Sequence, residues 1–134
     1  MIAKAFRGLI SAPPEPRAWW KVIAWWELRR IPCNIIVGGI GLICLLLFFL
    51  FIHLAHALQP GEDAIEPMVL FAAPILFNIA YTGGWIAELF LRIVSRERNS
   101  IIASTLLKLG LSFSLFIAIL PATIWFFIWV IGSI

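Results

Sequence analysis

The stretch that decides the fold is NIIVGGIGLICLLLFFLFIHLAHAL, which covers residues 34–58. It contains no acidic or basic side chain except two histidines, His53 and His56. A helix needs about 20 apolar residues to cross roughly 30 Å of hydrocarbon, and this stretch is long enough. It predicts a transmembrane helix at about residues 32–58 that begins with Pro32, a favourable first-turn residue. Two more apolar stretches follow, so the sequence predicts an all-α integral membrane protein with three spans.

The composition supports this fold class and limits what the protein can do. Of 134 residues, 63% are hydrophobic and only 13% are charged. Soluble domains carry about 25% charged residues. Outside the apolar stretches little chain is left for a separate water-soluble catalytic domain. We therefore expect a non-enzymatic protein that works in the membrane, at its surface, or through contacts with other membrane proteins.

Residues 1–30 form a basic, tryptophan-rich arm with six Lys or Arg residues and two Glu. Within residues 17–30, apolar side chains recur at helical spacing, which predicts an amphipathic helix. Tryptophan and arginine favour the headgroup level of a membrane. We expect this helix to lie at the membrane interface before the first span; the alternative is that it packs on a partner protein. The expected interface anchors in the arm are Trp19, Trp20, Trp25, Trp26, Arg29 and Arg30.

The second and third spans are expected at about residues 67–94 and 101–131. The last stretch can be read as one long helix kinked at Pro121 or as two short spans on either side of it. Lys108 at one edge and Trp125 with Trp129 at the other bracket about one membrane thickness of apolar residues. We therefore predict one long, Pro-kinked helix with these three residues as interface anchors.

Charge patterning predicts the orientation. The arm has a net charge of +4, the loop at residues 59–66 has three acids and no base, and residues 92–98 carry three Arg and one Glu. Positive charge is retained on the cytoplasmic side. The N-terminus is therefore expected in the cytoplasm and the C-terminus outside. The basic arm is expected to contact anionic lipid headgroups and not nucleic acid.

Polar and small residues form a narrow stripe on each of the first two predicted spans. Polar groups inside hydrocarbon usually face a partner, and glycines allow close approach of helices. The two stripes are therefore expected to face each other, with Gly83-Gly84 as a second point of close approach. The stripe residues are Asn34, Gly38 and Gly41 on the first span and Asn78, Tyr81, Thr82, Trp85, Glu88 and Arg92 on the second.

Glu88 is the one carboxylate inside a predicted span. Such a group can relay protons or bind a cation. However, Arg92 follows four residues later, which is the favourable order for an ion pair on one helix. We predict a structural salt bridge near the membrane surface, with Arg29, Arg30 and Asn34 at the same depth.

Two histidines and three carboxylates gather near the outer end of the first span. Imidazole and carboxylate groups together suit Zn, Fe or Mn, and a single histidine can also hold a pigment. The spacing is not that of a known ligand set, and the same residues also suit a solvated helix end and loop. The sequence requires no cofactor. The candidate metal or pigment ligands are His53, His56, Glu62, Asp63 and Glu66.

Three stretches resemble a group of small bacterial inner-membrane proteins with no assigned activity. They are Trp26-Glu27-Leu28-Arg29-Arg30 with Asn34, Gly61-Glu62-Asp63 with Glu66-Pro67, and Tyr81-Thr82 with Gly84-Trp85 and Glu88. The resemblance implies a bacterial inner-membrane location and brings no activity with it.

These observations favour an accessory or structural subunit of a larger membrane complex, whose partners are lipids and other integral membrane subunits. One alternative is a homo-oligomeric channel or pore-forming effector, in which the polar stripe of the second span lines a central path. A second alternative is a metal- or pigment-binding redox subunit that uses the histidines.

Overall fold

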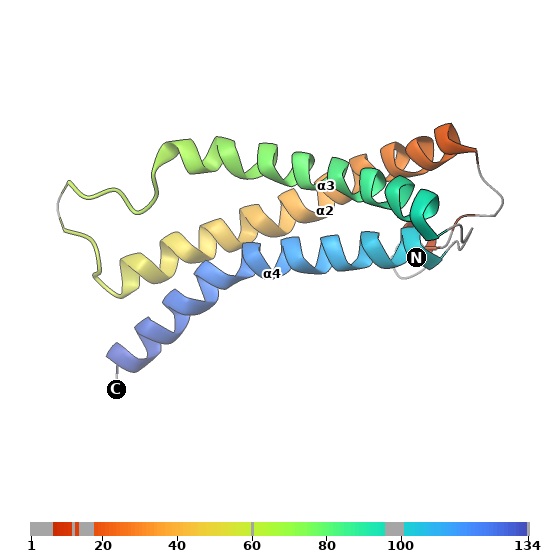
Figure 1. The fold of residues 1–134 in the computed structure, drawn as a ribbon. Helices are drawn as coiled ribbons and strands as arrows, with labels where there is room; N and C mark the ends of the chain where they lie inside the picture. Colours follow the sequence, from red (N-terminus) through yellow and green to blue (C-terminus); the bar gives the residue numbers. More distant parts are fainter. Residues whose placement is uncertain (1–6, 12, 14–17, 60, 96–100, 134) are drawn as a thin grey trace.

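The fold consists of three long helices. The computed structural model describes residues 7–11, 13, 18–59, 61–95 and 101–133. Its long helices are α2 (Trp19–Leu54), α3 (Pro67–Ser95) and α4 (Ile101–Gly132), residues 7–9 form a short helical turn, and the described residues contain no strand. Each helix is long and apolar enough to cross a membrane. The predicted all-helical, three-span fold is therefore confirmed (Figure 1).

Helix α2 differs from the prediction at its start. The expected interfacial helix and the first span form one continuous helix of 36 residues, with Pro32 in its interior. Pro32 is therefore not a first-turn residue, contrary to expectation. An internal proline loses one backbone hydrogen bond, and membrane helices tolerate this where neighbouring groups surround the site. Residues 1–6, 12 and 14–17 of the arm lie outside the described residues.

Helix α2 ends at Leu54, four residues before the predicted end. His56 has a left-handed backbone (φ 48°). The Ala57 N–H donates to the Ile52 carbonyl and the His56 N–H to the His53 carbonyl. These two bonds form a Schellman motif, which closes a helix after a left-handed residue. The first span therefore ends in a local hydrogen-bonded turn that hydrophobicity alone does not reveal.

Helix α4 is a single helix, which confirms one long third span. Pro121 lies inside it, and the helix bends in this region (Figure 1). Proline cannot donate to the carbonyl four residues earlier, and this loss commonly bends a helix. The bend lets the last part of α4 follow α2, where Trp129 stacks on Phe51 with ring centroids 5.9 Å apart.

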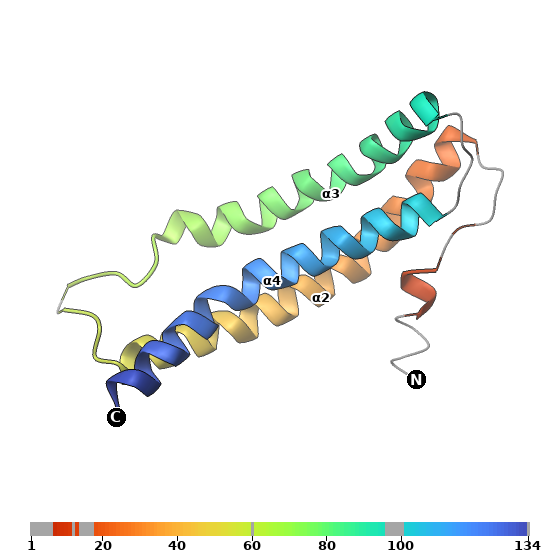
Figure 2. The same cartoon turned by 60° about the horizontal axis from the view of Figure 1, so that its bottom comes forward.

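Helix packing is uneven. Helix α2 packs along α4 for most of its length, and two buried clusters lie between these helices. Helix α3 joins only the first cluster and diverges from α2 and α4 towards its N-terminal end (Figures 1 and 2). The first cluster contains Val22, Trp25, Trp26, Cys33, Tyr81, Ala103 and Leu107, and the second contains Cys44, Phe48, Ile52 and Ala122.

Candidate functional site: a polar cluster between α2 and α3

A buried carboxylate lies at the centre of the polar contacts. Glu88 of α3 is fully buried. Its Oε2 accepts a hydrogen bond from Nε1 of Trp26 at 2.7 Å, and its Oε1 accepts one from Nε of Arg92 at 2.9 Å. The ion pair with Arg92 confirms the predicted salt bridge. A buried charge is stable only when it is paired and hydrogen-bonded, and both conditions are met here.

Trp26 lies close to the backbone of α3 because a glycine faces it. A Cβ atom built on Gly84 would lie 2.8 Å from the Trp26 ring. The Tyr81 hydroxyl donates to the Trp26 carbonyl at 2.7 Å, and the two rings meet edge to face at 5.4 Å. Gly84 therefore provides the predicted close approach, whereas a Cβ on Gly83 would meet nothing within 4 Å.

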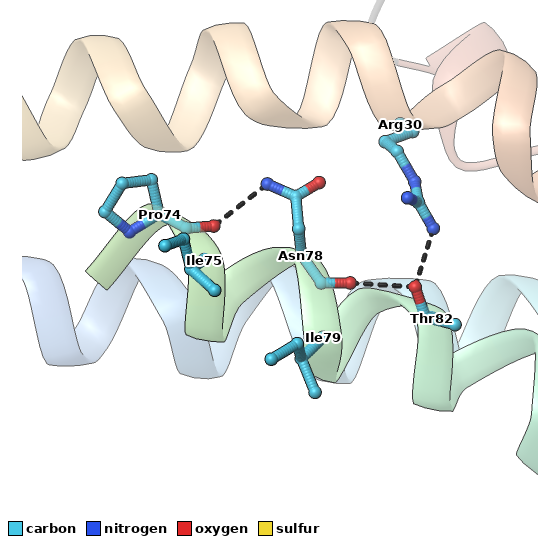
Figure 3. A pocket seen from close by; sticks show the side chains of 6 residues that line it. All are labelled: Arg30, Pro74, Ile75, Asn78, Ile79 and Thr82. Carbon is cyan, nitrogen blue, oxygen red and sulfur yellow. Dashed lines mark hydrogen bonds between the residues drawn. The ribbon is translucent and has the colours of Figure 1, made fainter. Parts of the chain in front are cut away.

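A second set of contacts lies further into the bundle. Arg30 of α2 reaches across to α3, and its Nη2 donates to Oγ1 of Thr82 at 2.8 Å (Figure 3). The amides of Asn34 and Asn78 donate to each other at 3.2 and 2.9 Å. The prediction that the two polar stripes face each other is confirmed at these positions. The two helices run antiparallel. Trp26, Arg30 and Asn34, in this order along α2, contact Glu88, Thr82 and Asn78, which follow the reverse order along α3.

The glycines of the α2 stripe behave differently from expectation. A Cβ atom on Gly38 or on Gly41 would meet nothing within 4 Å, so neither is a point of close approach. The reason is the divergence of α3 from α2 towards the N-terminal end of α3 (Figure 2). Trp85 is half-buried, and its Nε1 is buried without a hydrogen-bond partner among the described residues.

The first residues of the chain that the structure describes are held against α2 by Arg29. Its Nε donates to the Leu9 carbonyl at 2.7 Å and its Nη2 to the Gly8 carbonyl at 3.3 Å. The guanidinium also stacks on the Trp25 ring at 4.0 Å. Arg29 therefore joins the N-terminal segment to the first buried cluster, on which Leu9 packs.

The expected interface anchors differ in how far they are buried. Trp19, Trp20 and Lys108 are exposed on the outside of the bundle. Trp25 and Trp26, in contrast, are buried and turned inward, which corrects their interpretation as lipid-facing anchors. Indole suits the headgroup level and a buried acceptor equally well, since it combines an apolar ring with one N–H donor. Trp125 and Trp129 are half-buried and contact Phe48 and Phe51 of α2.

The candidate metal or pigment ligands do not converge. His53 and His56 are exposed, with ring centroids 6.5 Å apart, and Glu62, Asp63 and Glu66 are exposed as well. The Glu62 carboxylate accepts a hydrogen bond from the Gln59 N–H at 3.1 Å within the loop. Across the described ranges, no three His, Cys, Asp or Glu side chains lie close enough together to hold a metal ion.

One open groove lies beside the polar contacts. It separates α2 from α3, has a volume of about 440 Å³, and is lined by Arg30, Pro74, Ile75, Asn78, Ile79 and Thr82 (Figure 3). A second, smaller cavity of about 100 Å³ lies between α3 and α4, beside Trp26 and Tyr81. Arg30 borders the larger groove, which we call the α2–α3 groove.

Comparison with known proteins finds no match among family models, curated proteins or solved structures. The class of the protein therefore rests on its own features. Three apolar helices of membrane-spanning length and polar side chains turned towards one another define a small multi-span helical membrane protein.

Proposed function

We propose that this protein is a non-enzymatic accessory subunit that packs within a larger membrane complex. The observation that supports this role best is the first half of α3. None of residues 67–80 is buried, and Met68 and Phe71 are 78% and 73% exposed. This half-helix diverges from α2 and α4 and offers a long apolar side to another membrane helix (Figure 2).

The physics of helix association in lipid favours such a partner. Lipid tails are as apolar as leucine, so membrane helices associate through close packing and polar contacts rather than through the hydrophobic effect. The exposed side of this half-helix, which includes Met68 and Phe71, can gain that packing from another polypeptide. Methionine and aromatic residues, which are enriched where proteins meet, are present on this side of α3.

The polar contacts favour assembly over conduction. A channel of several copies needs polar side chains turned towards a shared water-filled path. In the single chain, Tyr81 and Glu88 are buried, and Asn78 pairs with Asn34. These groups join α2 to α3 and do not face a shared path, which favours a structural role over conduction.

Site-specific photocrosslinking in the native membrane tests the proposal. A benzophenone amino acid replaces Phe71 on α3, and a matched control replaces Phe116 on the exposed side of α4. We expect a discrete adduct at position 71 in which the added mass is that of a different polypeptide, and no such adduct at position 116.

Two outcomes would contradict the proposal. Lipid adducts alone at both positions would mean that α3 faces lipid. An adduct of about twice 15.1 kDa would mean self-association and would move the channel alternative ahead. Conductance recordings with Asn78→Leu would then follow, since a pore lined by the α3 stripe should lose conductance.

A further inference from the structure

We propose that the α2–α3 groove binds one anionic phospholipid, whose phosphate contacts Arg30 and whose acyl chain lies along Pro74, Ile75 and Ile79. The proposal does not depend on the accessory-subunit role. It rests on the position of the groove along the bundle, on the hydrogen bonding of Arg30 and on the apolar wall that continues from it.

Arg30 lies at the edge of the apolar part of the bundle. Residues 31–54 of α2 contain no Asp, Glu, Lys or Arg, and at 1.5 Å per residue they extend about 36 Å. That length covers roughly one hydrocarbon thickness. Glu27, Glu88 and Arg92 lie at the same end of the bundle as Arg30. We therefore infer that the guanidinium lies at the level of the phospholipid phosphates.

The hydrogen bonds of Arg30 leave part of its guanidinium available. Nη2 contacts both the Glu27 carboxylate at 2.9 Å and the Thr82 hydroxyl at 2.8 Å. Nε is buried and has no partner among the described residues, so a phosphate outside the bundle does not reach it; a phosphate contacts the exposed part of the Arg30 side chain, which is 28% exposed. The neighbouring cation, Arg29, is turned towards the N-terminal segment instead. Arg30 is thus the cation of the groove, and a guanidinium can donate several hydrogen bonds to one phosphate.

The other groove residues form a wall that suits an acyl chain. Pro74 to Thr82 cover about 12 Å along α3, from the level of Arg30 towards the middle of the span. Ile75 and Ile79 are 60% and 63% exposed, so the wall opens to the outside of the bundle. A Cβ atom on Gly38, one turn beyond Asn34 on α2, would meet nothing within 4 Å, and this keeps the facing side open.

The net charge favours an anionic lipid over a zwitterionic one. Residues 1–30 carry a net charge of +4. Cations between membrane helices near the membrane surface attract anionic headgroups, and Arg30 is the cation among the residues that line the groove. Glu27 opposes this attraction, because its negative carboxylate forms an ion pair with Nη2 of Arg30, the same nitrogen that donates to Thr82. Loss of the Glu27 charge should therefore strengthen lipid binding.

Native mass spectrometry of the full-length protein tests the site. The protein is delipidated in detergent and titrated with dioleoylphosphatidylglycerol or with dioleoylphosphatidylcholine. We expect one phosphatidylglycerol molecule to bind more tightly than the rest. Arg30→Gln should weaken this first binding step on the order of tenfold, since hydrogen bonds to charged groups are the strong ones. Lys21→Gln, which removes an exposed cation from the same helix, should leave it within about twofold.

Three further variants separate lipid binding from folding. Ile79→Trp fills the groove without touching the Arg30 hydrogen bonds and should also weaken the first step, whereas Ile86→Trp, at an exposed α3 position outside the groove, should not. Glu27→Gln should strengthen it. Equal binding of phosphatidylglycerol by the wild type, Arg30→Gln and Ile79→Trp would overturn the proposal. So would equal binding of both lipids, or the isolation of the native protein with a polypeptide that covers the groove in place of a lipid.

Discussion

The indole Nε1 of Trp26 in α2 lies 2.7 Å from Oε2 of Glu88 in α3; both side chains are buried, and the two residues are 62 positions apart in the sequence. The hydrogen bond joins the tryptophan-rich segment to the carboxylate of the second span. It explains why a charged group is stable inside this bundle, since Arg92 balances the charge and Trp26 satisfies the second oxygen.

Replacement of Trp26 by phenylalanine should destabilise the bundle. The variant keeps an aromatic ring and removes the N–H donor to Glu88. A lost hydrogen bond to a buried charged group costs about 1–3 kcal/mol in the free energy of unfolding. Steric trapping in a bilayer measures this quantity. Trp19→Phe makes the same chemical change at an exposed position and should have little effect; equal destabilisation by the two variants would argue against the Trp26–Glu88 bond.

The Glu88–Arg92 ion pair should show strong non-additivity. Arg92→Met leaves the Glu88 carboxylate buried without its ion-pair partner and should cost about 3 kcal/mol or more. The double variant with Glu88→Gln removes the charge as well and should recover much of the loss. A double-mutant cycle on unfolding free energies checks this. Additive effects of the two substitutions would mean that the pair is not coupled.

Adjacent glycines of α3 should respond in opposite ways to alanine. Gly84→Ala places a Cβ atom 2.8 Å from the Trp26 ring, and overpacking of this kind costs about 1–3 kcal/mol. Gly83→Ala meets open space and should stabilise the helix by up to about 1 kcal/mol, since alanine favours helix over glycine. Unfolding of both variants in the same detergent compares them. A stabilising Gly84→Ala would contradict the close approach of α2 and α3.

The Asn34–Asn78 pair should contribute modestly to the association of α2 with α3. Reciprocal amide hydrogen bonds between membrane helices are worth about 0.5–2 kcal/mol. The single variants Asn34→Leu and Asn78→Leu should each lower stability, and the double variant should lose less than the sum. Unfolding free energies in one bilayer composition give the coupling energy. A coupling energy of zero would mean that the two amides act independently.

The sequence by itself determined the membrane class and the local contacts. Long apolar stretches predict three spans because hydrocarbon demands them, and helical spacing predicts the ion pair of Glu88 with Arg92 because both lie on one helix. The polar stripes also predicted that the first two spans face each other, since unpaired polar groups are costly in lipid. They did not predict the pairing: Asn34 was expected at the depth of Glu88, and it meets Asn78 instead.

The tertiary structure alone decided which way each helix turns and where its neighbours lie. Helical periodicity relates side chains on one helix and does not set the rotation or tilt of another helix against it. Trp25 and Trp26 are therefore buried although their chemistry also suits a membrane surface, and Gly84 rather than Gly38 is a point of close contact. The divergence of α3 and the groove beside Arg30 follow from that tilt, which only the packing of three helices together establishes.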